Sequence, residues 1–200
     1  ESVVDRTDQH QQQRADGKPD RFAGKAIQHQ GRNHDSEKNP EAMIAEMKNW
    51  LEKAVIGLNL CPFAKAVHVK QQIRYVVSNA TNEEELLADL LDELQQLYDA
   101  DADILETTLL IHPYVLTDFL DYNDFLEVAD AAVSELSLDG EIQVASFHPD
   151  YQFAETRYED VENYSNRAPY PCLHLLRESS VEKAVAAFPE AEKIYQKNID

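Results

Sequence analysis

Two histidines stand directly after short hydrophobic runs, and a proline follows each of them. The segment 107–111 leads into His112-Pro113, and the segment 142–147 leads into His148-Pro149. Each run is typical of a buried β-strand that is stopped by a proline. If the two strands are parallel neighbours, both imidazoles open onto the edge of the sheet where α/β proteins bind ligands. There they could serve as catalytic acids and bases.

An imidazole pair can also form part of a metal site. Two or three neutral imidazoles with a carboxylate or thiolate suit zinc or iron, and Asp150 lies two residues after His148. His112, His148 and Asp150 are therefore the candidate ligands of a transition metal. The alternative is that each histidine hydrogen-bonds a nearby carbonyl and only helps to end its strand.

Cys61, which precedes Pro62, is the third candidate for catalysis. If a helix begins at Pro62, Cys61 is its N-cap, and the helix dipole together with Lys65 and His68 favours the thiolate. Such a thiol could act as a nucleophile or as a redox sensor, with Cys172 as a candidate partner. If an upstream helix ends at Cys61 instead, the residue is a small hydrophobic side chain at a helix junction. Cys172 is expected in the core.

The stretch from Pro149 to Pro171 has no clear periodicity, and long connections of this kind are often functional. It carries five aromatic residues, so we expect it to pack across the sheet edge. Its end offers amide, guanidinium and phenol groups suited to an anionic small molecule. The candidate substrate-binding residues in and after it are Asn163, Asn166, Arg167, Tyr170, His174 and Arg177. The alternative for Arg167 is a salt bridge to Glu159, Asp160 or Glu162.

The charge balance narrows the classes of partner. The chain of 200 residues has 18 basic and 38 acidic residues, and the whole excess of negative charge lies in residues 41–200. Such an acidic domain repels a phosphate backbone, so nucleic acid is not an expected partner. No run approaches the 18 apolar residues of a membrane span, and no signal peptide is apparent. Two distant cysteines fit a reducing compartment, and we expect a cytoplasmic protein.

Several common motifs are missing. Only Gly57 and Gly140 lie within residues 41–200, which is too few for a dinucleotide fingerprint or a P-loop. The chain also has no G-x-S-x-G, C-x-x-C or H-E-x-x-H sequence. We therefore expect no nucleotide cofactor, and a transition metal remains the candidate cofactor.

Hydrophobic periodicity predicts helices alternating with strands. A helix over 39–60 is expected to bury a stripe that runs from Met43 to Leu58. The candidate helix caps are Asn39, Thr81, Thr117 and Ser179. Strands are predicted at 73–78, 107–111, 142–147 and 172–176, and a last short helix at 189–197.

This order predicts a single small α/β domain over 41–200. Its sheet is expected to be mixed or mostly parallel, with about four strands flanked by helices. The alternative is an α+β sandwich of ferredoxin-like type, in which some strands are antiparallel. Residues 1–40 show neither helical nor strand periodicity, so we expect a poorly ordered tail there.

Four blocks of the sequence resemble one known family. They are LCPFAKAV (60–67), LLIHPY (109–114), FHPDYQF (147–153) and NYSNRAPYPCLHLLRE (163–178). Together they resemble a mostly bacterial family of unknown function, the domain of unknown function 1415, over roughly residues 43–187. The resemblance implies a cytosolic bacterial protein and assigns no catalytic residues. Ala168 stands where the family pattern has a serine, so a hydroxyl at this position is not part of our interpretation.

Three hypotheses for the function remain open. The first is a small-molecule enzyme in which His112 and His148 are acid/base groups or metal ligands, Cys61 is a nucleophile, and Arg167 and Arg177 hold an anionic group. The second is a binding or assembly module without chemistry. The third is a redox sensor that acts through Cys61.

Overall fold

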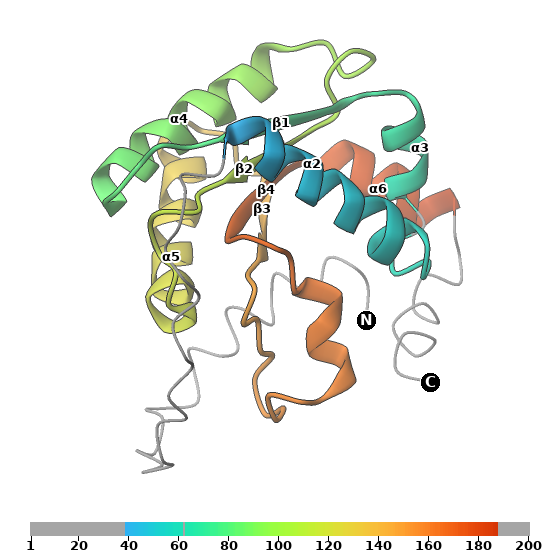
Figure 1. Cartoon of the computed structure of the whole chain (residues 1–200). Helices are drawn as coiled ribbons and strands as arrows, with labels where there is room; N and C mark the ends of the chain where they lie inside the picture. Colours follow the sequence, from blue (N-terminus) through green and yellow to red (C-terminus); the bar gives the residue numbers. More distant parts are fainter. Residues whose placement is uncertain (1–38, 62, 188–200) are drawn as a thin grey trace.

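A computed structural model describes residues 39–61 and 63–187 of the chain (Figure 1). Almost all of the expected tail and the expected helix at 189–197 lie outside these residues. The helices are α2 (Pro40–Trp50), the π-helix η1 (Leu51–Ile56), α3 (Ala64–Val69), α4 (Glu83–Asp99), α5 (Phe119–Glu135) and α6 (Glu178–Ala187). The strands are β1 (Ile73–Val77), β2 (Thr107–Ile111), β3 (Ile142–Phe147) and β4 (Cys172–Arg177), and a 3-10 helix, η2 (Val161–Asn166), precedes β4.

The four strands form one mixed sheet in the order β1-β2-β4-β3. β1 and β2 are parallel, whereas β4 is antiparallel to both β2 and β3. This confirms a small α/β domain with a mixed sheet. The expectation that β2 and β3 are neighbours is wrong, because the long connection after β3 returns β4 between them. β2 and β3 still run in the same direction, so their carboxyl ends lie at the same edge of the sheet.

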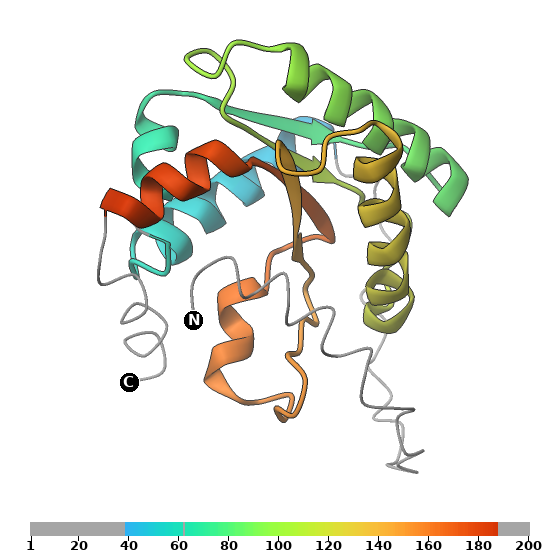
Figure 2. The same cartoon turned by 180° about the vertical axis from the view of Figure 1, so that it is seen from behind.

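Helices cover both faces of this sheet (Figures 1 and 2). One hydrophobic core joins α4 and α5 to alternate strand residues such as Leu110, Leu173 and Leu175. A second core joins Met47 of α2 to the intervening strand residues, such as Leu109, whose side chains point to the opposite face of the sheet. Strand alternation therefore sends His112 and His148 to the α5 face and His174 to the α2 face. Among the described residues, no helix is long and apolar enough to span a membrane.

Local sequence signals predict where helices occur more accurately than they predict the residue at which each helix begins or ends. Asn39 caps α2 as expected, since its side chain accepts the Glu41 N–H at 3.0 Å. The caps of α4 and α5 are Asn82 and Asp118, one residue after the expected Thr81 and Thr117. In both cases the later side chain has the extended backbone that lets its oxygen reach the first free N–H groups.

Two further expectations about helices are wrong. Ser179 lies inside α6, because the helix begins at Glu178 directly after β4. Leu58 is 68% exposed instead of buried. The helix changes to π geometry at Leu51 and ends at Ile56, so the stripe that contains Met43, Met47, Leu51 and Val55 stops one turn before Leu58.

Candidate functional site

His112 and His148 meet around the ring of Tyr122. Both histidines are fully buried at the carboxyl ends of β2 and β3. Their ring centroids lie 5.6 Å and 5.1 Å from that of Tyr122, which comes from the first turns of α5. We call these three side chains the imidazole cluster. The structure thus brings the two expected histidines together on one face, although β4 separates their strands.

Hydrogen bonds fix the tautomers of both imidazoles. The Nδ1 of His112 lies 3.0 Å from the Val115 carbonyl oxygen, which can only accept, so Nδ1 carries the proton. The Nε2 of His148 donates in the same way to the Leu116 carbonyl at 3.3 Å, while its Nδ1 accepts the Asp150 N–H at 3.0 Å. Leu116 has a left-handed backbone with φ of 55°. The two imidazoles therefore hold the strained turn between β2 and α5.

One nitrogen of the cluster has no partner. The Nε2 of His112 is buried and lacks a hydrogen bond within the described part of the chain. Burial, with a smaller contribution from the nearby His148, lowers the pKa of His112 to about 4. Burial also lowers the pKa of His148. Both rings are therefore neutral near pH 7, and His112 keeps a free lone pair on Nε2.

The Tyr122 hydroxyl bonds to backbone groups at the ends of two strands, beneath the two imidazole rings. It donates to the Cys172 carbonyl at 2.8 Å and accepts the Phe147 N–H at 3.1 Å. Phe147 and Cys172 are the paired residues at the ends of β3 and β4. The phenol thus satisfies two backbone groups at the point where the β3–β4 pairing stops.

Asn163 organises the connection between β3 and β4 instead of facing a ligand. Its side chain is fully buried, and its oxygen accepts the Phe153 N–H and the Thr156 hydroxyl. Its amide group donates to the Arg157 and Tyr158 carbonyls. Every bonding position of this side chain is used within the connection, so the expected contact with substrate finds no free group here.

Asn166 also has a structural environment. Its amide donates to the Ser146 carbonyl at 3.1 Å, and its backbone carbonyl accepts the His148 N–H. Tyr170 donates its hydroxyl to Glu46 of α2. These contacts fasten the connection to the sheet and to α2, and they bear out the expectation that it packs across the sheet edge.

Arg167 is held by carbonyls and aromatic rings. Its guanidinium donates to the Tyr151 and Tyr158 carbonyls at 3.0 Å and 2.6 Å. It lies 4.1 Å and 4.6 Å from the ring centroids of Tyr158 and Tyr164. The alternative salt bridge is not formed with Asp160, whose carboxylate pairs with Arg157 instead.

Asp150 does not join the imidazoles as a metal ligand. Its carboxylate accepts the Tyr158 hydroxyl at 2.8 Å, and its backbone N–H occupies the Nδ1 lone pair of His148. In residues 39–61 and 63–187, no group of three or more His, Cys, Asp or Glu side chains could hold a metal ion. The geometry of this region therefore lends no support to the expected metal site.

His174 and Arg177 lie away from the imidazole cluster. His174 faces α2, as its alternation with Leu173 and Leu175 predicts, and its Nε2 lies 2.7 Å from the Thr107 hydroxyl. Burial lowers its pKa to about 4. Arg177 stands at the opposite end of β4 and donates to carbonyls at the end of α4 and in the loop after it. Neither residue therefore belongs to the imidazole cluster, and a role of either in substrate binding stays a prediction.

Cys61 lies between η1 and α3 and is partly exposed. The N-cap of α3 is Phe63, so of the two alternatives for Cys61 the position at a helix junction is the one found. His68 pairs with Glu52 at 3.3 Å. The backbone N–H of Cys61 donates to the Val55 carbonyl, and its carbonyl accepts the Ala64 N–H. Cys172 is buried, as expected, and burial raises the pKa of its thiol.

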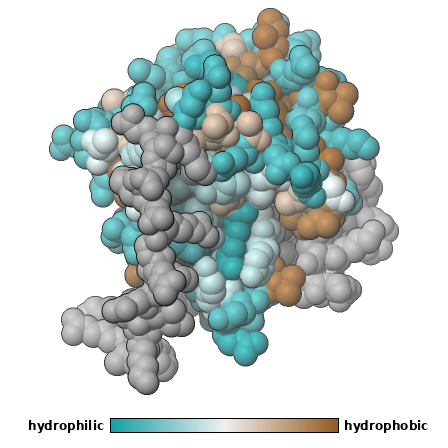
Figure 3. Space-filling view, viewed as in Figure 1, coloured by the Kyte–Doolittle hydropathy of each residue, from teal (hydrophilic) through white to brown (hydrophobic). Residues whose placement is uncertain are grey.

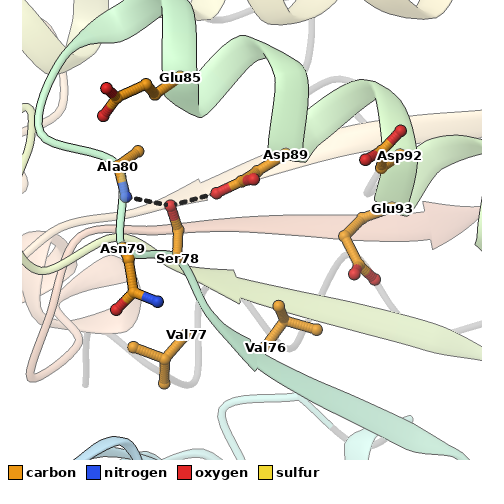
Figure 4. A pocket seen from close by; sticks show the side chains of 9 residues that line it. All are labelled: Val76, Val77, Ser78, Asn79, Ala80, Glu85, Asp89, Asp92 and Glu93. Carbon is orange, nitrogen blue, oxygen red and sulfur yellow. Dashed lines mark hydrogen bonds between the residues drawn. The ribbon is translucent and has the colours of Figure 1, made fainter.

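The sequence reasoning missed a cavity of about 520 Å³ at the end of β1. We call it the acidic cavity. It is lined by Val76, Val77, Ser78, Asn79 and Ala80 from β1 and the turn after it, and by Glu85, Asp89, Asp92 and Glu93 from α4. Figure 4 shows the α4 side chains along one side of the strand, and the surface over α4 is largely hydrophilic in Figure 3. The available signals were the polar pair after β1 and the carboxylates repeated at helical spacing.

The carboxylates of the acidic cavity differ in their partners. Glu93 is nearly buried and forms a bidentate pair with Arg74 at 2.8 Å and 3.1 Å. Asp89 accepts the Ser78 hydroxyl, which also accepts the Ala80 N–H. Hydrogen bonds from Thr81 lower the pKa of Glu85. Among the described residues, only Glu93 of these four carboxylates is paired with a cation.

Comparison with known proteins identifies the family and nothing narrower. No curated protein and no solved structure matches the chain. A family model described as "Protein of unknown function (DUF1415)" matches residues 42–200. This is the family that the four sequence blocks resemble, and the match includes both histidines, Cys61 and the whole connection between β3 and β4. The chain belongs to the DUF1415 family.

Proposed function

We propose that the domain is a non-catalytic binding module that holds cationic groups in the acidic cavity. The observation that carries the proposal is an open cavity with four carboxylates and a single paired cation among the described residues. A positively charged ligand would neutralise Asp89 and Asp92 without displacing an existing ion pair. The surrounding excess of acidic residues would also steer a cation toward the domain.

The contrast with the expected enzyme site supports this choice. An anionic substrate needs free donors, but the guanidinium groups of Arg167 and Arg177 donate to backbone carbonyls. The amide of Asn163 is likewise used inside its own connection. Binding an anion there would require the molecule to give up contacts that hold its own fold.

Titration of the full chain with spermidine tests the proposal. At low salt, the double variant Asp89→Asn/Asp92→Asn should bind about tenfold more weakly than the wild type, because it lacks two carboxylates of the cavity. The matched control is Asp121→Asn/Asp124→Asn, which removes two charges from exposed positions of α5. Calorimetry should find its affinity within about twofold of the wild type. Equal weakening in both variants would show unspecific attraction and defeat the proposal.

A second candidate keeps the imidazole cluster as a ligand site of an enzyme. The observation in its favour is the buried Nε2 lone pair of His112, which a hydroxyl or amine of a substrate could satisfy. In that case His112 would be the general base. Screening the full chain with small alcohols and amines by 15N NMR of the His112 ring tests this reading. A ligand that shifts the Nε2 signal supports it, and no shift with any class counts against it.

A further inference from the structure

The outer edge of β1 is unpaired. Among the described residues, β1 pairs only with β2. The Ser78 N–H donates to the Ile111 carbonyl, so the backbone groups of Val76 and Arg74, which share its parity, also point to β2. The N–H and C=O groups of Ile73, Tyr75 and Val77 therefore point outward, and every residue of the strand is partly exposed.

The acidic cavity reaches this outer edge of β1. Val76 packs toward the core that contains α4, whereas Val77 packs toward the core that contains α2. Both nevertheless line the same cavity. The cavity therefore reaches the backbone of β1 as well as α4, next to the position where a further strand would be added.

β1 has few of the features that protect an edge strand. Natural edges are blunted by lysines, prolines, bulges or coverage. The sequence of β1 is Ile-Arg-Tyr-Val-Val, which favours strand pairing. Its one charge, Arg74, is turned to Glu93 of α4. The outward backbone groups are thus available as a template for another extended segment.

The α4 carboxylates have the spacing of alternate strand residues. Glu85, Asp89 and Glu93 are four residues apart, which is about 6 Å along a helix. Residues i and i+2 of a strand are about 6.7 Å apart and lie on the same face. Cationic side chains at alternate positions of an added strand would therefore meet Glu85 and Asp89, while Glu93 keeps its pair with Arg74.

We propose that β1 accepts an extended segment of a partner protein, with Lys or Arg at alternate positions, as an additional strand of the sheet. The inference rests on the proposed function and names its partner class. Backbone hydrogen bonds to Tyr75 and Val77 would supply much of the affinity, and the α4 carboxylates would select the basic residues. Val76, which lies on the α4 face, would contact the aliphatic stems of the cationic side chains.

A second copy of this chain fits the edge less well. Two β1 strands paired edge to edge about a twofold axis perpendicular to the sheet would place both α4 helices on the same face. Each helix would bring its own Glu85, Asp89 and Asp92 toward the other. Like charges at this distance repel, whereas a basic segment is complementary.

Two backbone-methylated peptides provide the test on the wild-type chain. The probe is an acetylated, amidated hexapeptide that alternates lysine with valine. In an added strand every second N–H faces β1, so N-methylation of one alternate set should weaken binding at least about tenfold. N-methylation of the other set should change it by less than about threefold. Fluorescence anisotropy measures both, and amide exchange should slow at Tyr75 and Val77.

The outcomes separate this inference from the proposed function. If the two methylated peptides bind equally while spermidine still depends on Asp89 and Asp92, strand addition is overturned and cation binding stands. If spermidine binding does not depend on those residues, the proposed function fails as well. If the chain forms a dimer in sedimentation that the peptide disperses, the occupant of the edge is a second copy, and the proposed partner is wrong.

Discussion

The imidazole cluster and the acidic cavity lie at the same edge of one sheet, and they use polar residues in opposite ways. The carboxyl ends of β1, β2 and β3 all reach this edge. At β2 and β3 the polar groups turn inward and bond to backbone atoms. At β1 they line an open cavity. A catalytic residue type at a strand end therefore does not by itself mark a binding site.

The difference follows from where backbone groups need partners. Most of the connection from β3 to β4 is not part of a helix or strand, so its backbone groups need other partners. Asn163, Asn166 and Arg167 supply hydrogen bonds to them. The turn after β1 is short, and α4 begins at Glu83 with a side-chain cap of its own. Of its cavity carboxylates, Glu85 accepts the Thr81 N–H, whereas Asp89 and Asp92 bond to no backbone group among the described residues and remain available to a ligand.

The largest expected effect is the loss of Asn163. Asn163→Ala removes four hydrogen bonds inside the connection, and we expect a loss of about 4 kcal/mol in the free energy of unfolding. Urea denaturation measures the loss. The control in the open region is Asn79→Ala, at an exposed position, which should change the stability by less than about 0.5 kcal/mol. Equal effects would remove the distinction between the two regions.

The second prediction concerns the pH dependence of stability. The pKa of His112 is lowered from 6.5 to about 4 in the fold, so the unfolded chain binds the proton more readily between these values. The contribution of the neutral His112 to stability is fully present above pH 6.5 and is lost as the pH falls toward 4. The free energy of unfolding then falls by about 3 kcal/mol. His112→Asn retains a donor for the Val115 carbonyl but does not titrate. Denaturation at several pH values should show that the variant loses less stability than the wild type as the pH falls. If stability falls equally in both proteins, the prediction is wrong.

The third prediction tests the phenol beneath the cluster. Tyr122→Phe keeps the ring between the imidazoles but leaves the Phe147 N–H and the Cys172 carbonyl without their partner. We expect the free energy of unfolding to fall by about 2 kcal/mol. Tyr98→Phe is the control, since Tyr98 is 48% exposed, and it should be nearly neutral. A neutral Tyr122→Phe would mean that water reaches the strand ends.

Much of the fold could be predicted from the sequence because its signals are local. Hydrophobic periodicity predicted all four strands and the buried face of α2, with Met43 and Met47. The order of the strands could not be predicted, since it depends on the path of the connection after His148. The caps at Asn82 and Asp118 were missed by one residue because neighbouring polar side chains compete for the same N–H groups.

The candidate site could be predicted less well, for a different reason. The types of His112, His148 and Asn163 indicate capable donors and acceptors, but not whether a ligand or the chain's own backbone uses them. The acidic cavity shows the converse. Carboxylates such as Asp89 and Asp92 on a helix usually form a solvated face, and only the three-dimensional position of β1 turns them into the wall of a cavity.

The smallest expected effect is a gain in stability instead of a loss. Asp92 is exposed, and no cation pairs with it among the described residues. Asp92→Asn should therefore raise the free energy of unfolding by about 0.3 kcal/mol, because it relieves repulsion from Asp89, three residues earlier on the helix. Thermal unfolding should show the gain at low salt and lose most of it at about 1 M salt, where the screening length is about 3 Å. A clear loss of stability would mean that this carboxylate supports the fold as Asn163 does, and the acidic cavity would then be another closed region rather than a site.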